Sequence, residues 1–177
     1  MELTQWIEEA LRLGFDYAVA LDPAALQPQQ SVRQMCAADR CGAYGKNWTC
    51  PPHIGDLELC AARLRSYSCG LLLQTVGKTE KRIDTKAYRC TEEVHLQHFY
   101  ALCEKVRAIH PKALCLGSGG CRICGKCAWP EACRFPEKAY ASMEGYGLFV
   151  TGVCRDNGLD YHHGEMTVTY TACILIE

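Results

Sequence analysis

The sequence predicts an α/β fold in which a mixed sheet is flanked by helices. Helix-like and strand-like patterns alternate along the 177 residues, which is typical of this class. The chain is long enough for one hydrophobic core, and 49% of its residues are hydrophobic. We find no internal repeat and no low-complexity tract. We therefore expect a single α/β metal-binding domain over residues 1–177, with two cysteine-rich loops at about 31–55 and 117–138.

Four segments have the apolar spacing of helices. In the first of them, Thr4 is the expected N-cap and Gly14 the expected stop. The longest carries Leu96, Phe99 and Cys103 at i, i+3 and i+7. The predicted helices are residues 3–14, 56–67, 85–110 and 142–154.

Four further segments have the patterns of strands. Phe15, Tyr17 and Val19 lie on one side of an alternating segment that Asp22-Pro23 ends. A continuous apolar run from residue 69 is typical of a buried strand. The predicted strands are residues 15–21, 69–76, 112–116 and 165–176.

The charge distribution excludes several classes of protein. The net charge is -1, so no excess of positive charge is present to neutralise phosphates, and we expect no nucleic-acid partner. Apolar runs are only strand-sized, and the N-terminus has neither a basic nor an apolar stretch, so we expect no membrane association, no secretion and a cytoplasmic location. The charge is uneven, however, because residues 31–140 carry about +7 while each flank carries about -4.

Cysteine is over-represented, with 14 residues in the chain. Such a content approaches that of disulfide scaffolds, but those are short secreted chains. In a chain of this length without a signal peptide, clustered cysteines indicate metal binding or thiol chemistry.

The stronger cysteine motif lies in the second loop. Cys121, Cys124 and Cys127 are separated by two residues each, and Cys133 follows, with Pro136 three residues later. Bacterial ferredoxins open with the same Cys-x2-Cys-x2-Cys run and place a Pro beside the fourth Cys. Structural zinc sites more often pair two separated knuckles. The motif therefore predicts a [4Fe-4S] cluster, with zinc as the alternative.

The first loop contains a second motif, Cys36-x4-Cys41-x8-Cys50, followed by Pro51-Pro52-His53. Three cysteines without an obvious fourth thiolate would leave one iron of a cluster open, or His53 would be the fourth ligand. Two other interpretations remain: the three cysteines complete one site with the later run, or they are free thiols.

Basic residues surround both motifs. We expect them to lower the pKa values of the thiols and to stabilise an anionic metal centre, although a solvated basic face is an equal alternative. These residues are Arg40, Lys46, Arg122, Lys126 and Arg134.

The other seven cysteines have the positions of small apolar residues on helices and strands, except Cys90, which the pattern leaves undecided. The remaining six are Cys60, Cys69, Cys103, Cys115, Cys154 and Cys173. The pairs His95/His98 and His162/His163 have the arrangement of possible metal ligands, but we interpret them as ordinary surface or capping residues.

The two motifs, with the Ser142-Met143-Glu144-Gly145-x-Gly147 segment after them, resemble the predicted metal-binding proteins called domain of unknown function 2284. The resemblance spans most of residues 31–154. It implies cysteine-bound metal, iron–sulfur in kind, in a small cytoplasmic protein, but no particular reaction. Ala141, Gly145 and Phe149 depart from the pattern that we expect of the family. By position, the implied ligands are Cys36, Cys41, Cys50, Cys121, Cys124, Cys127 and Cys133.

These observations favour a protein with one or two [4Fe-4S] clusters that transfers electrons or serves as an accessory redox protein, with a redox partner protein. The first alternative is an enzyme that uses an open iron for sulfur transfer, dehydration or small-molecule reduction. The second is a zinc-stabilised binding module.

Overall fold

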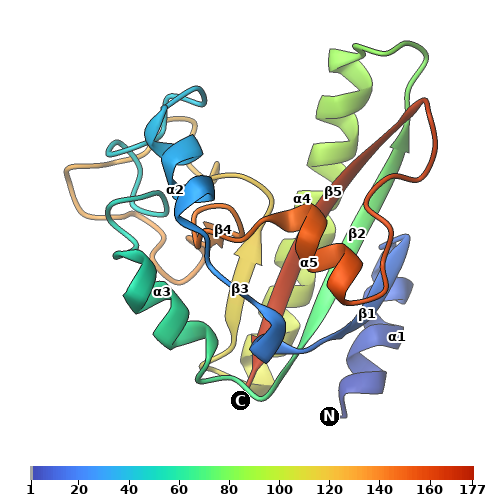
Figure 1. Ribbon diagram of the computed structural model, residues 1–177, viewed down its shortest axis with the longest axis horizontal. Helices are drawn as coiled ribbons and strands as arrows, with labels where there is room; N and C mark the ends of the chain where they lie inside the picture. The colour runs from blue at the N-terminus through green and yellow to red at the C-terminus, as the bar shows by residue number, and fades with distance from the viewer. Residues whose placement is uncertain (1) are drawn as a thin grey trace.

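The computed structural model describes residues 2–177 and contains a five-stranded sheet of order β1-β2-β5-β3-β4 (Figure 1). Only the β3–β4 pair is parallel, and the other neighbours are antiparallel, so the sheet is mixed. The predicted fold class is confirmed. The strands are β1 (Tyr17–Leu21), β2 (Cys69–Lys78), β3 (Leu114–Gly117), β4 (Ala141–Ser142) and β5 (Thr167–Ile176).

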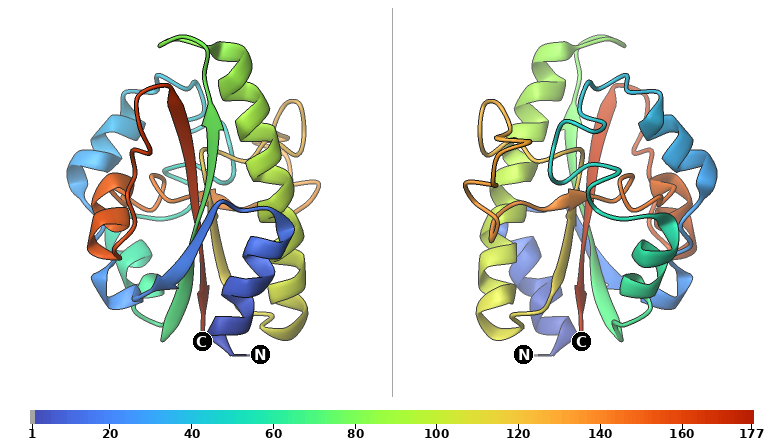
Figure 2. Two further views of the ribbon diagram at one scale, coloured as in Figure 1. Left: turned by 90° about the vertical axis from the view of Figure 1, so that its right-hand side faces the viewer. Right: turned by 90° about the vertical axis from the view of Figure 1, so that its left-hand side faces the viewer.

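Helices cover both faces of the sheet, as the two side views in Figure 2 show. One face carries α1 and α4, which also contact each other. The opposite face carries α2, α3 and α5. Among residues 2–177 the α-helices are α1 (Leu3–Leu13), α2 (Gln30–Ala37), α3 (Leu57–Leu64), α4 (Thr85–Ile109) and α5 (Val150–Asp156).

The central strands separate two hydrophobic cores. Along β2, Leu71 and Leu73 face the core beneath α1 and α4, whereas Leu72 faces the other core. This division follows from the alternation of side chains along a strand. Both faces are buried, which explains why β2 has a continuous apolar run in the sequence.

The sequence-based boundaries are correct for most elements, with three differences. The N-cap of α1 is Glu2 rather than Thr4, because Glu2 and Gln5 form a capping box, while Gly14 ends the helix as predicted. The helix α2 lies inside the predicted first loop. It was missed because Val32 is its only buried residue, which leaves almost no apolar pattern.

The third difference is the predicted helix over 142–154, which is wrong over its first half. Ser142 pairs with Gly117 in the sheet, a tight turn follows, and α5 begins only at Val150. Gly147 has a φ of 79°, and a Cβ there would lie 3.2 Å from the backbone nitrogen of Gln29. Glycine adopts this left-handed φ readily, and it lies outside the range of a right-handed helix.

The parallel pair β3–β4 positions the cysteine-rich loops. Parallel strands end at the same edge of a sheet, so the segments that follow Gly117 and Ser142 emerge side by side. One is the second cysteine loop and the other is the turn that contains Glu144. Within residues 2–177, no helix combines the length and apolar character that a membrane span requires.

Candidate metal centre

Hydrogen bonds join the two cysteine loops, although about 70 residues separate them in the sequence. The Asn47 side chain donates to the carbonyl of Cys121 at 3.2 Å, and the Cys121 amide donates to Thr49 Oγ1 at 3.1 Å. The Trp48 indole N–H donates to the carbonyl of Glu131 at 2.8 Å. Figure 1 shows the two loops side by side beyond β3 and β4. The fold thus brings both predicted motifs to one place.

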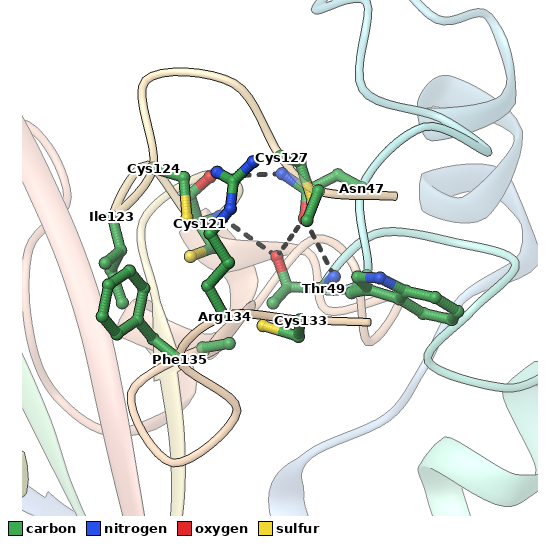
Figure 3. A pocket seen from close by; sticks show the side chains of 12 residues that line it. Asn47, Thr49, Cys121, Ile123, Cys124, Cys127, Cys133, Arg134 and Phe135 are labelled. Atoms are coloured by element: carbon green, nitrogen blue, oxygen red, sulfur yellow. Dashed lines mark hydrogen bonds between the residues drawn. The ribbon is translucent and has the colours of Figure 1, made fainter. Parts of the chain in front are cut away.

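The four cysteines of the second loop line one small pocket (Figure 3). The exposed Arg134 side chain also lines this pocket, and its Nη1 donates to the carbonyl of Lys126 at 3.4 Å. The enclosed volume is about 20 Å³, which is little more than one water molecule requires. The cysteines are Cys121, Cys124, Cys127 and Cys133.

The three cysteines of the first motif line a second and much larger cavity, of about 370 Å³. Cys36, Cys41 and Cys50 all face it. Asn47 and Cys121 line both cavities, so they form a shared wall. Gly120 keeps space beside one sulfur, because a Cβ there would lie 3.1 Å from Cys50 Sγ. The two sites are therefore direct neighbours.

The last turn of α2 places Cys36 at this cavity. The backbone amide of Gln29, just before the helix, donates to the carbonyl of Gly147 at 2.7 Å, which ties α2 to the turn after β4. In the same contact region, Cys36 Sγ lies 3.7 Å from the carbonyl oxygen of Glu144.

Glu144 also lines the larger cavity. Its Oε2 atom is buried and has no hydrogen-bond partner among the described residues. Burial raises the pKa of the Glu144 carboxyl, while nearby polar groups, its own backbone amide first, act in the opposite direction. A carboxyl group with a buried, unpaired oxygen is a candidate ligand-binding group.

The expected lowering of thiol pKa values is wrong for three of the motif cysteines. Burial is the main cause that raises the pKa of Cys36 and Cys121, and it raises the pKa of Cys50 to about 11, with a further contribution from the neighbouring thiols. These thiols are therefore protonated at neutral pH until a metal displaces the protons.

The neighbouring cations have other partners. Lys46 pairs with Asp39 at 2.8 Å, and Arg122 pairs with Glu92 at 2.7 Å. Each of these cations is thus partly neutralised by a carboxylate rather than directed at sulfur.

His53 does not reach the three-cysteine cavity. Its ring packs against the indoles of Trp48 and Trp129, at centroid distances of 5.1 and 5.4 Å. The sequence reasoning instead missed Asn47, Thr49 and Glu144 as site residues. Glu144 was visible only as part of the Ser-Met-Glu-Gly segment.

The remaining cysteines lie largely where the sequence analysis placed them. Cys60, Cys103, Cys115, Cys154 and Cys173 are buried, consistent with core positions. Cys69 is partly buried, and Cys90 is exposed.

The structure places two of the candidate histidines in packed positions rather than at the predicted surface positions. His95 is completely buried and shares a 3.0 Å hydrogen bond with Thr75, so its interpretation as a surface residue is wrong. His163 stacks on Tyr17 at a centroid distance of 4.4 Å and contacts Gln74. Both histidines are thus engaged in packing away from the cysteine cavities.

The residues at these cavities fit a bound metal centre in their chemistry. Seven thiols, the ligands that soft metals and iron–sulfur clusters prefer, line two adjoining cavities, and one carboxyl oxygen there has no partner. Among residues 2–177, no three histidine, cysteine, aspartate or glutamate side chains converge closely enough to hold a single metal ion.

The fold and these cavities define an α/β protein with a cysteine-rich candidate metal centre at one edge of its sheet. The chain belongs to the family DUF2284, described as predicted metal-binding proteins, whose family model matches residues 19–176. The family assignment therefore agrees with the resemblance that the motifs indicated. No curated protein and no solved structure matches the chain.

Proposed function

We propose that this metal-binding protein holds at least one [4Fe-4S] cluster and acts in electron transfer or as an accessory redox protein. One observation carries the proposal: the fold brings seven motif cysteines, from two distant loops, to two adjoining cavities. Adjacent clusters of this type pass electrons at reduction potentials that their protein environment sets.

The larger cavity supports a cluster rather than a single ion. Its volume of about 370 Å³ far exceeds what one metal ion requires, and its thiols come from separate parts of the loop: α2, the following turn and Cys50. Thiols that are spread around a cavity suit a polynuclear core, because each iron of the core takes its own cysteine.

The basic residues around the two cysteine loops favour docking to an acidic redox partner. Residues 31–140 carry about +7, and both loops lie in this range. Arg40, Lys126 and Arg134 belong to these loops. Electron transfer to an acidic partner should therefore slow as the salt concentration rises.

Zinc is the second candidate, and the four-cysteine pocket is the observation that favours it. Its volume of about 20 Å³ is closer to the size of a single ion than to that of a cluster, although the four sulfurs must draw together to bind the ion. An enzymatic role is favoured by the larger cavity, which leaves room for a small molecule beside the three sulfurs.

Metal and acid-labile sulfide analysis of anaerobically purified protein tests these candidates. About eight irons and eight sulfides per chain indicate two clusters, and about four of each indicate one. About four irons with one zinc would assign zinc to one of the two sites. Zinc alone, in a colourless protein, would refute the proposal.

Two variants show which site holds which metal. Cys36→Ser should remove metal from the larger cavity only, and Cys127→Ser from the smaller pocket only. Cys90→Ser is the matched control, because Cys90 is exposed on α4 and lies outside both cavities. It should leave the metal content unchanged.

A further inference from the structure

The seven cysteines at the site divide unequally between its two cavities. Of these two cavities, Cys124, Cys127 and Cys133 line the smaller pocket and not the larger, and Cys121 completes that group of four in sequence. Cys36, Cys41 and Cys50 line only the larger cavity. If each group binds its own centre, the larger cavity supplies three thiolates, and one iron of a four-iron centre there is open to a ligand of another kind.

Glu144 is the side chain at this cavity with an unused ligand atom. It lines the cavity beside the three cysteines, its backbone carbonyl contacts Cys36 Sγ, and its Oε2 is buried without a hydrogen-bond partner. His53, the alternative from sequence, is packed against tryptophans instead.

The strand pairing fixes Glu144 in this position. Gly117 and Ser142 are paired in the parallel register. Gly119 and Glu144 each follow two residues later, at the edge of the sheet where both strands end. The Ser142 Oγ accepts a hydrogen bond from the Gly145 amide at 2.9 Å, which holds the turn. A ligand at the end of a strand is more rigidly placed than one in a long loop.

The nearby cations do not account for a buried carboxylate. Arg122, which lines the same cavity, is paired with Glu92 at 2.7 Å. Arg33 donates to the carbonyl of Gly55 and to Cys60 Sγ. A buried carboxylate without a cation is costly, and a metal ion would remove that cost.

Resting on the proposed function, we propose that the Glu144 carboxylate is the fourth protein ligand of an iron–sulfur centre that Cys36, Cys41 and Cys50 hold. Carboxylate oxygens ligate iron in proteins, but they are harder donors than thiolates. The Glu144-bound iron is therefore the one that differs from the other three and exchanges first. The carboxylate binds in its ionised form, and no electron transfer is involved.

The test uses the full chain with Cys124→Ser and Cys127→Ser, which leaves only the three-cysteine centre to bind iron. This protein and its Glu144→Gln derivative are reconstituted anaerobically with ferrous iron and sulfide. Mössbauer spectroscopy and the rate of iron loss to a chelator are then measured. Glu92→Gln in the same background is the matched control, because it changes a carboxylate that pairs with Arg122 at the cavity but has no place in the proposed ligand set.

With Glu144 present, Mössbauer spectra should resolve one iron distinct from the others. Glu144→Gln should change that subspectrum alone and should accelerate loss of the first iron by at least about tenfold, while Glu92→Gln changes neither. Glu144→Asp, which keeps a carboxylate, should partly restore slow release. Circular dichroism of the metal-free proteins checks that each variant is folded.

The outcomes separate the two proposals. Iron in both proteins, with identical spectra and release rates, overturns the role of Glu144 and leaves the proposed cluster intact. No iron or sulfide uptake by the three-cysteine protein and by the unmodified chain overturns the proposed function and the ligand role together.

Discussion

Asn47 holds the two cysteine loops together, and its replacement by alanine is the most direct test of the site's architecture. The Asn47 side chain is almost fully buried. Its Oδ1 accepts from the Thr49 amide at 3.0 Å and from Thr49 Oγ1 at 3.1 Å, and its Nδ2 donates to the Cys121 carbonyl at 3.2 Å. The variant Asn47→Ala therefore loses three hydrogen bonds and leaves their partners unsatisfied.

The magnitude follows from these bonds. At about 1 kcal/mol net for each, Asn47→Ala should lower the free energy of unfolding by about 3 kcal/mol. For a chain of this size, that corresponds to a decrease in Tm of about 6–12 °C. Cys121 should also become more accessible, because its carbonyl loses its link to the first loop.

Urea unfolding of the reduced, metal-free protein measures the stability, and peptide mapping after brief thiol alkylation measures the reactivity of Cys121. Asn157→Ala is the control: it also loses two side-chain hydrogen bonds, with Val153 and Asp22, but at the far end of α5. It should destabilise the chain without exposing Cys121. A loss below about 0.5 kcal/mol for Asn47→Ala, or unchanged alkylation, would refute the proposed link.

Three further predictions concern the stability of the fold and the effect of bound metal. Gly77→Ala should destabilise the protein by about 1–3 kcal/mol in thermal unfolding, because the added Cβ would clash with Thr91 Oγ1. Adding Thr91→Ala to this variant should recover part of the lost stability. No recovery would mean that the clash is not the cause. Burial lowers the pKa of His95 to about 3, so the unfolded chain takes up a proton below about pH 6.5 that the folded chain does not. Unfolding free energy should then fall by up to about 1.4 kcal/mol per pH unit from pH 6.5 toward 3, and His95→Gln should reduce this slope; an unchanged slope contradicts the assignment. A chelator should lower the Tm of metal-loaded protein but not of Cys36→Ser/Cys127→Ser, and equal shifts would show a non-specific effect.

The sequence was informative wherever a local pattern decided the outcome. The apolar run of β2 and the i, i+3, i+7 spacing of α4 predicted these elements, since burial leaves a direct periodic trace. The cysteine spacings likewise predicted which thiols line the same cavity. Such patterns record contacts that repeat along one segment of the chain.

The sequence failed where a contact joined distant segments. The segment from Ser142 has the composition of a helix, yet pairing with Gly117 makes it a strand and a turn. Glu144 acquires its place at the three-cysteine cavity only through that pairing, and Asn47 acquires its role only through a partner 74 residues away. No local signal encodes these relations.

The protonation of the thiols has a consequence for how metal enters. Because burial raises the pKa values of Cys36, Cys50 and Cys121, each of these residues must release a proton when it binds metal. Metal affinity should therefore rise with pH across the neutral range. The hydrogen bonds of Asn47 and Thr49 hold the two loops together, which reduces the cost of bringing the loops to each other when metal binds. The affinity of these buried thiols for metal is therefore controlled directly by pH.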